Sequence, residues 1–249
     1  MADTAITAAI LVIGDEILSG RTKDKNIGYI AEYLTNLGID LREVRVVPDE
    51  EPEIVAAVNA LRERYTYLFT TGGIGPTHDD ITADSIAKAL GVGIDHDPRA
   101  VAMMQERYAP GELNEARMRM ARIPFGADLI ENPISKAPGF IVQNVIVMAG
   151  VPSIMQAMLD SVSPRLAGGA RMITETIDAH GLAEGNYASD LAALDKEHPA
   201  VSIGSYPSFT GSGFRNQIVV RGKDAAAVAH AAENVRSLVA RLTGDGAPA

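Results

Sequence analysis

The sequence predicts an α/β protein in which a mostly parallel sheet is covered by helices on both faces and is followed by a small α+β domain. Residues 8–13 are apolar without alternation, as in a parallel strand that is buried on both faces. Strand and helix patterns then alternate along the first two-thirds of the chain. After the Gly168-Gly169 turn the pattern changes to strand, helix, strand, strand, helix. We therefore expect a three-layer α/β/α domain over residues 1–168 and a separate α+β domain over residues 169–249.

The elements of the first domain are marked by capping and turn residues between apolar stretches. From Asn26 the apolar side chains recur at helical spacing, and Gly38 stands where a left-handed helix end is favoured. Pro52 suits the first turn of a helix, and Gly91 suits the end of a later one. The expected order is strand 8–13, helix 26–38, strand 39–47, a helix from 52, strand 67–71, helix 82–90, helical segments 98–108 and 113–121, a hairpin-like pair flanking Asn144, and helix 152–162.

The second domain has a different pattern in fewer residues. Its expected strands are 171–178, 200–206 and 214–222, and its expected helices are 184–196 and 224–242. No Gly-x-x-Gly loop joins two helices there, so the nucleic-acid clamp of a true KH domain is missing.

Charge and composition exclude several classes of protein. The formal net charge is −10 and Lys and Arg do not cluster, so we expect no nucleic-acid partner. No apolar run approaches the roughly 18 residues that span a bilayer, so we expect no membrane partner. The first nine residues lack Lys and Arg, unlike a signal peptide, and there is no Cys. We therefore expect a cytoplasmic protein whose metal ligands, if any, are oxygen or nitrogen atoms.

The strongest functional signal is a loop rich in glycine and aspartate that follows the strand at 67–71. Its sequence is Thr71-Gly72-Gly73-Ile74-Gly75-Pro76-Thr77-His78-Asp79-Asp80-Ile81-Thr82. Ligands of open parallel sheets bind beyond the carboxyl ends of the strands, and glycines let backbone N–H groups approach an anion closely. The loop lacks the Gly-Lys-Ser/Thr of a Walker loop and is not a dinucleotide fingerprint. It therefore predicts a phosphate site of another kind.

Three other segments have a similar placement. Two follow the first two strands, and the third lies further along the chain with a basic side chain, Lys136, that could pair with a phosphate as a point charge. Each segment, taken alone, is equally compatible with an ordinary turn. The segments are Gly14-Asp15-Glu16-Ile17-Leu18-Ser19-Gly20 with Asn26, Pro48-Asp49-Glu50, and Asn132-Pro133-Ile134-Ser135-Lys136-Ala137-Pro138-Gly139-Phe140 with Gly150-Val151-Pro152.

These motifs resemble the amino-terminal domain of the CinA family, the competence- and damage-inducible proteins A. The likeness extends through about residue 168, and that domain belongs to the wider molybdopterin-binding superfamily. Residues 171–249 resemble the small middle domain of the same family, which is described as KH-like. The carboxyl-terminal amidase domain of full-length members is missing, so we expect no nicotinamide mononucleotide deamidation. Ser135 replaces a usual glycine, and Ile74 replaces a usual leucine.

The resemblance implies a metal-dependent pyrophosphatase acting on ADP-ribose or a related nucleotide, releasing AMP and ribose 5-phosphate. The implied cofactors are a divalent metal, Mg²⁺, Mn²⁺ or Co²⁺, with the help of potassium. A molybdopterin-binding protein without pyrophosphatase activity is the main alternative, since Asp49 and Asp80 match acidic positions of that branch. A noncatalytic oligomeric scaffold that binds nucleotides is the third possibility.

The site residues expected from the motifs and the resemblance fall into three sets. The expected catalytic residues are Asp80, Asp79 and Asp49. The expected metal ligands are Asp15, Asp79 and Asp80. The expected contacts to the nucleotide or pterin phosphate are Gly14, Asp15, Glu16, Ser19, Gly20, Asn26, Thr71, Gly72, Gly73, Gly75, Pro76, Thr77, Thr82, Asn132, Lys136, Pro138, Gly139, Gly150 and Pro152.

Self-association is the last expectation. Relatives with this fold are usually oligomers, and a methionine-rich segment between Met103 and Met120 offers apolar surface. We therefore expect a homo-oligomer, with this segment as core or interface.

Overall fold

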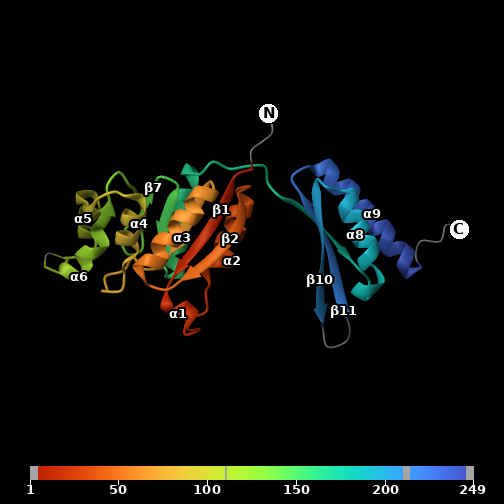
Figure 1. The fold of residues 1–249 in the computed structure, drawn as a ribbon, viewed down its shortest axis with the longest axis horizontal. Helices are drawn as coiled ribbons and strands as arrows, with labels where there is room; N and C mark the ends of the chain where they lie inside the picture. The colour runs from red at the N-terminus through yellow and green to blue at the C-terminus, as the bar shows by residue number, and fades with distance from the viewer. Residues whose placement is uncertain (1–4, 110, 210–213, 245–249) are drawn as a thin grey trace. The chain divides into compact units, whose positions relative to one another are not determined.

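The computed structural model describes residues 5–109, 111–209 and 214–244, and the chain divides into two compact units (Figure 1). The first unit comprises residues 1–169 and the second residues 170–249. No helix within the described ranges is both long and apolar enough to cross a membrane.

The first unit is built on a six-stranded sheet with the order β2-β1-β3-β8-β7-β6. The pairs β1–β2, β1–β3 and β3–β8 are parallel, whereas β7 runs antiparallel to both β8 and β6. The mostly parallel α/β sheet expected from the sequence is thereby confirmed. The strands are β1 (Thr7–Ile13), β2 (Asp40–Val47), β3 (Tyr67–Thr71), β6 (Asp128–Ile130), β7 (Gly139–Val142) and β8 (Val145–Met148).

Two hydrophobic clusters lie on the two faces of this sheet and make the unit three layers thick. Alternate residues of β1 point to opposite faces, so Leu11 packs among side chains of α3 and α4 while Ile10 packs among those of α2 and α7. Both residues are fully buried, which explains why the strand is apolar without alternation. The four helices are α2 (Asn26–Asn36), α3 (Glu51–Arg64), α4 (Thr82–Leu90) and α7 (Pro152–Val162).

Several short elements complete the unit, and most of them were not predicted. A two-stranded sheet, β4 (Ile94–His96) with β5 (Arg122–Pro124), lies beside α4. Three-residue strands such as these and β6 are too short to show a periodicity in sequence. The two expected helical segments are α5 (Pro98–Gln105) and, in shorter form, α6 (Glu115–Met118) followed by the 3₁₀ turn η1 (Arg119–Ala121); a further short helix is α1 (Asp15–Leu18).

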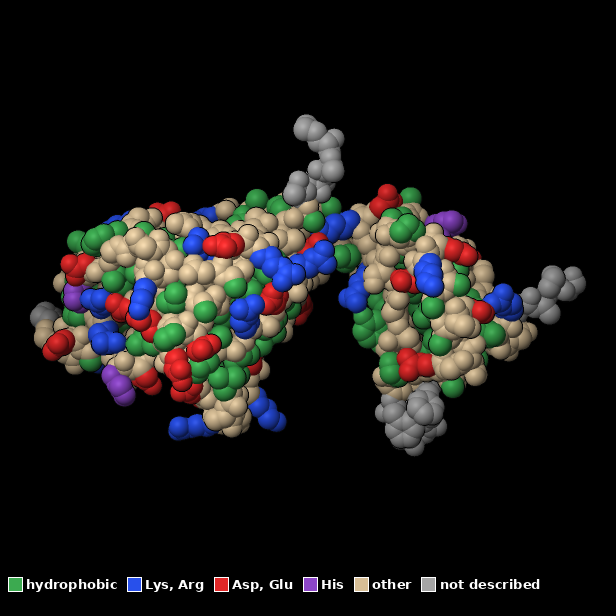
Figure 2. All heavy atoms as spheres, viewed as in Figure 1, with side chains coloured by type: hydrophobic (Ala, Val, Ile, Leu, Met, Phe, Trp, Pro, Cys, Tyr) green, Lys and Arg blue, Asp and Glu red, His purple; other side chains and the backbone are tan. Residues whose placement is uncertain are grey.

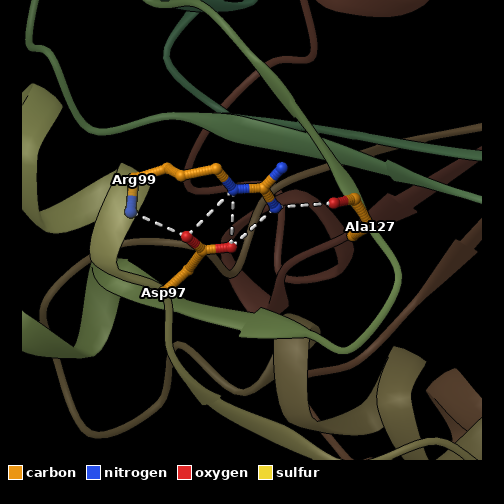
Figure 3. A network of polar contacts seen from close by, with 3 residues as sticks. All are labelled: Asp97, Arg99 and Ala127. Atoms are coloured by element: carbon orange, nitrogen blue, oxygen red, sulfur yellow. Dashed lines mark hydrogen bonds and ion pairs between the residues drawn. The ribbon is translucent and has the colours of Figure 1, made fainter.

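A polar network fixes the start of α5 (Figure 3). The Asp97 carboxylate accepts a hydrogen bond from the Arg99 N–H at 2.8 Å and forms an ion pair with the Arg99 guanidinium at 2.7 Å. The same guanidinium donates to the Ala127 carbonyl oxygen at 2.9 Å, just before β6. One carboxylate therefore caps the helix and, through Arg99, joins it to a chain segment 28 residues away.

The second unit is a three-stranded antiparallel sheet with the order β10-β11-β9, packed against two helices. The core is formed by apolar residues of α9 such as Val235, together with Ile218 and Tyr187. Asp224 caps α9, because its carboxylate accepts from the N–H groups of Ala226 and Ala227. The elements are β9 (Ile173–Asp178), the 3₁₀ turn η3 (Glu184–Asn186), α8 (Ala188–Glu197), β10 (Val201–Phe209), β11 (Phe214–Gly222) and α9 (Ala225–Thr243). The small α+β domain expected from the sequence is confirmed.

Candidate functional site

A cleft of about 610 Å³ lies at one end of the six-stranded sheet. The loops that line it follow β1, β3, β6 and β8, which run in the same direction because β6 is antiparallel to β7 and β7 is antiparallel to β8. The carboxyl ends of parallel strands meet at one edge, and this is where open α/β sheets bind ligands. Nine of the expected site residues line the cleft: Glu16, Gly72, Gly73, Gly75, Pro76, Asp80, Asn132, Gly150 and Pro152.

The glycine loop after β3 passes too close to its neighbours for side chains at its first two positions. Gly72 has φ 102°, and a Cβ there would lie 2.1 Å from the Ile13 carbonyl oxygen. Gly73 has φ 66°, and a Cβ there would lie 2.1 Å from the Thr82 hydroxyl oxygen, which itself donates to the Gly72 carbonyl at 3.0 Å. Positive φ and close contact together require glycine at both positions.

Three successive residues of this loop line the cleft and have backbone N–H groups without an acceptor among the described residues. The Gly72 N–H donates to the Met148 carbonyl at 3.3 Å, and the Thr77 N–H donates to the Asp80 carboxylate at 2.8 Å. The N–H groups of the intervening residues Gly73, Ile74 and Gly75 have no hydrogen-bond partner among the residues that the structure describes. Successive unpaired N–H groups in a loop of this kind form an anion-binding concavity.

Asp80 stabilises the same loop. Its carboxylate accepts from both the backbone N–H and the hydroxyl of Thr77, at 2.8 and 2.5 Å. A Cβ at Gly75 would lie 2.6 Å from Asp80 Oδ2, so the carboxylate packs directly against the loop. The expected catalytic and metal-binding residue is thus engaged in holding the loop, while also lining the cleft.

Carboxylates from three loops lie near one another beside the cleft. The Asp15 N–H donates to Asp49 Oδ2 at 2.9 Å, which joins the loops after β1 and β2. Burial raises the pKa of Asp49 above its ordinary value, and the negative charges of Asp15, Glu16 and Asp79 add to this rise. Figure 2 shows acidic side chains gathered on the first unit beside the projecting segment that contains α1. A raised pKa makes a carboxylate a better proton acceptor.

The metal expected at Asp15, Asp79 and Asp80 has no preformed site. Within the ranges 5–109, 111–209 and 214–244, no three Asp, Glu or His side chains form a group that could hold a metal ion. The Asp80 carboxylate is used by Thr77, and Asp15 contributes its N–H rather than its carboxylate to the contact with Asp49.

Two buried asparagines hold the backbone of loops that line the cleft. Asn132 accepts from the N–H groups of Ile134 and Ser135 and donates to the Ala137 carbonyl at 2.9 Å and to the Ser135 hydroxyl. Asn26 donates to the Gly150 carbonyl at 2.8 Å. Both side chains hold loop backbone, and the hydroxyl of Ser135 adds a contact that a glycine at this position would lack.

Other expected ligand contacts lie outside the cleft. Lys136, expected to pair with phosphate, instead pairs with Glu106 at 2.6 Å. Thr71 and Thr82 are buried beneath the glycine loop, and Pro138 borders a much smaller neighbouring cavity. The remaining expected contacts that do not line the cleft are Gly14, Asp15, Ser19, Gly20, Asn26, Thr77 and Gly139.

The structure adds cleft residues that sequence reasoning missed. Tyr108, Arg117 and Met120 come from the segment after α5, and Ile154 and Met158 come from α7. The alternation Arg117-Met118-Arg119-Met120 is a sequence signal that could have indicated Arg117 and Met120. Within the methionine-rich segment, Met104 is fully buried in the core and Met120 lines the cleft.

Comparisons with known proteins agree with the two units. The family described as "probable molybdopterin binding domain" matches residues 9–168, and the family described as "FAD synthase, middle domain" matches residues 171–243. A protein from Pyrobaculum arsenaticum is 36% identical over 210 residues, which cover 80% of this chain and 79% of that protein. A protein from Thermoplasma acidophilum is 32% identical over 205 residues, which cover 80% of each chain.

A solved structure supports the expected likeness to CinA. The protein CinA with unknown function from Thermoplasma acidophilum has 36% sequence identity and a TM-score of 0.62, and the match covers 65% of this chain and 98% of that one. The CinA-like character of the first unit is thereby confirmed. The second unit matches the FAD synthase middle domain, whereas its expected KH-like character stays a prediction.

Proposed function

The chain belongs to the family of probable molybdopterin binding domains, and we propose that its cleft binds a nucleotide with two linked phosphates, of the ADP-ribose class. The observation that carries the proposal is one cleft that combines an apolar wall with three N–H groups of the glycine loop that have no partner in the described part of the chain. Such a site suits a ligand with an anionic and an aromatic part.

The anionic part is expected at the glycine loop. The N–H groups of Gly73, Ile74 and Gly75 can donate to phosphate oxygens, and no side chain at Gly73 or Gly75 blocks a close approach. Charge from Lys or Arg is not required for this contact, because backbone dipoles supply the positive potential. Phosphate binding is therefore compatible with a chain of net charge −10.

The organic part is expected on the apolar wall. Tyr108, Met120 and Ile154 line the same cleft, whose volume lies in the range of roughly 300–1,000 Å³ usual for small-molecule and cofactor sites. A diphosphate nucleotide is supported over a pterin monophosphate by the match of the second unit to a FAD synthase domain. FAD itself contains two nucleotide halves joined by a diphosphate.

Calorimetric titration tests the ligand class directly. ADP-ribose, FAD and a pterin phosphate are titrated in turn into the purified chain, with ribose as a ligand without phosphate. We expect saturable binding of ADP-ribose or FAD and none of ribose. Tighter binding of the pterin phosphate than of either nucleotide would favour the molybdopterin-binding alternative instead, and binding of none of the three would contradict the proposal.

Hydrolysis of the diphosphate is a second candidate function, favoured by the position of Asp49, whose Oδ1 would lie 3.6 Å from a Cβ at Gly73 of the glycine loop and whose pKa burial raises. A carboxylate of this kind can take the proton of an attacking water, and a divalent ion from solution, Mg²⁺, Mn²⁺ or Co²⁺, is the proposed cofactor, with potassium as a helper. Mg²⁺ is often held by one or two carboxylates together with substrate phosphates, so the proposal does not require a group of three protein ligands.

Chromatographic detection of AMP tests the hydrolysis. The chain is incubated with ADP-ribose with and without Mg²⁺ or Co²⁺, alongside Asp49→Asn. We expect AMP only with added metal and at least about a hundredfold less of it from the variant, the usual scale for losing a positioned acid-base group. Equal AMP production by folded Asp49→Asn would exclude this role of Asp49.

A further inference from the structure

Tyr108 and Arg117 form a stacked pair on a wall of the cleft. The Arg117 guanidinium carbon lies 4.5 Å from the centre of the Tyr108 ring, and both residues line the cleft. Tyr108 follows α5 and Arg117 belongs to α6. The pair therefore joins two parts of the excursion, the segment of residues 106–121 between α5 and β5. The proposed function uses Tyr108 only as part of the apolar wall and does not use Arg117.

The guanidinium of Arg117 is held in place before any ligand arrives. Its Nη1 donates to the Glu112 carbonyl oxygen at 2.5 Å, and its backbone N–H donates to the Asn114 side chain at 3.0 Å, which caps α6. Its guanidinium carbon lies over the Tyr108 ring. The side chain is half-buried, so its conformational entropy is already reduced.

The excursion is also attached to the loop between β6 and β7. The Arg107 guanidinium donates to the Ile134 carbonyl at 3.2 Å, and Lys136 pairs with Glu106 at 2.6 Å. These contacts position Tyr108 and Arg117 relative to Asn132 and Ala137, which line the same cleft. The wall is therefore preorganised.

We propose that the Arg117–Tyr108 pair is the recognition surface for the heteroaromatic ring of the ligand, which stacks on the guanidinium while its phosphates lie at the glycine loop. This inference rests on the proposed function and adds the ring to the ligand class. Planar guanidinium groups stack on aromatic rings, a property that the compact ammonium of lysine lacks. The pair therefore selects ring-bearing phosphates over simple ones.

Two alternatives to ring recognition by Arg117 would give different experimental results. If its charge alone binds the phosphates, lysine should replace it with little effect on a ring-bearing ligand. If it only stabilises the fold, its replacement should lower the melting temperature and weaken every ligand alike. Arg117→Lys and Tyr108→Leu separate these cases, and Tyr108→Phe is the matched control because it keeps the ring under Arg117.

The experiment is calorimetric titration of each variant with ADP-ribose and with inorganic pyrophosphate, together with its melting temperature. We expect Arg117→Lys and Tyr108→Leu to bind ADP-ribose about tenfold more weakly, the scale of one stacking contact. Their affinity for pyrophosphate and their melting temperature should stay near those of wild type. Tyr108→Phe should match wild type with both ligands.

Two results would overturn the inference while leaving the proposed function intact: wild-type ADP-ribose affinity in Arg117→Lys, or a loss shared equally by ADP-ribose and pyrophosphate. Failure of the wild-type chain to bind any ring-bearing phosphate would overturn both. A melting temperature lowered in Arg117→Lys together with weaker binding of both ligands would assign Arg117 to the fold.

Discussion

At the residue scale, Asp97 combines a helix cap with an ion pair. Its side chain is 15% exposed, and the hydrogen bonds from Arg99 hold its pKa below the ordinary value (Figure 3). A carboxyl group with a lowered pKa in the folded state stabilises that state when it is ionised. The stabilisation is complete above the unfolded pKa of about 3.9 and is lost as the pH falls through the folded value.

Two substitutions separate the two roles of Asp97. We expect Asp97→Ala to lower the free energy of unfolding at neutral pH by about 1–2 kcal/mol, because it removes both the cap and the ion pair. Asp97→Asn keeps a capping oxygen and should cost about 0.5 kcal/mol. Urea titrations at pH 7 and at pH 3 measure both. The difference between wild type and Asp97→Asn should shrink at pH 3, and a larger difference there would refute the assignment.

The sequence motif identified Asp80 as a site residue but did not indicate which contacts its carboxylate makes. The sequence placed it in a phosphate loop, and the structure puts it at the cleft with its carboxylate bonded twice to Thr77. Lys136 is a similar case, because its partner Glu106 is 30 residues away and could not be inferred from the motif. Partner choice depends on tertiary packing, which a local pattern does not encode.

We expect Asp80→Asn to loosen the loop rather than unfold the chain. Asparagine can accept from Thr77 but lacks the charge that strengthens these bonds, so ADP-ribose should bind several-fold more weakly. Thermal melting shows whether the fold is kept, and calorimetry gives the affinity. Wild-type affinity in the folded variant would mean that the loop does not need this carboxylate.

At the element scale, the glycine loop offers a substitution that tests phosphate approach without straining the backbone. Gly75 does not have a positive φ, and a Cβ there would lie 2.6 Å from Asp80 Oδ2, so only the end of the Asp80 side chain must shift to accept it. We expect Gly75→Ala to keep its melting temperature and to weaken ADP-ribose and pyrophosphate binding by about tenfold, the value of one lost charge-assisted contact of roughly 1.5 kcal/mol. A stable variant with unchanged affinities for both ligands would place the phosphates elsewhere.

Gly73→Val is the contrasting change. A side chain at this position would meet the Thr82 hydroxyl oxygen and would require a positive φ from a β-branched residue. We therefore expect a lower melting temperature as well as lost binding. An unchanged melting temperature would contradict the close contact with Thr82.

Most elements could be predicted because their lengths exceed one period of the apolar pattern. The bounds of β3, α4 and α7 agree with the sequence analysis, since each is closed by a glycine, a proline or a polar turn. The excursion between α5 and β5 could not be assigned in the same way. Its half-buried residues face a cleft rather than a continuous core, so Arg117 and Met120 follow neither a helical nor a strand pattern.

At the scale of the whole molecule, self-association stays a prediction. Its sequence argument relied on the methionine-rich segment, which the structure uses partly in the core, through Met104, and partly in the cleft, through Met120. We still expect a dimer or trimer, with exposed apolar side chains such as Val44 or Phe125 available for contact. Sedimentation at micromolar concentration checks this, and a single species of 26.3 kDa would contradict it.

Nucleic-acid binding is expected to be absent from both units. The net charge is −10, and no Lys and Arg cluster occurs in the sequence. Filter binding with a mixed RNA at low salt is the measurement. Retention that weakens steeply as salt rises would overturn this expectation.

The central claim, that the glycine loop donates its free N–H groups to a ligand's phosphates, is tested most directly by hydrogen exchange of these groups. Amide exchange of residues 72–75 and of Thr77 is followed with and without saturating ADP-ribose. The amides of Gly73, Ile74 and Gly75 have no acceptor within the described protein, so they should exchange quickly in the free chain and slow markedly when ADP-ribose is bound. Bound ADP-ribose that leaves the exchange of these three amides unchanged would contradict the account.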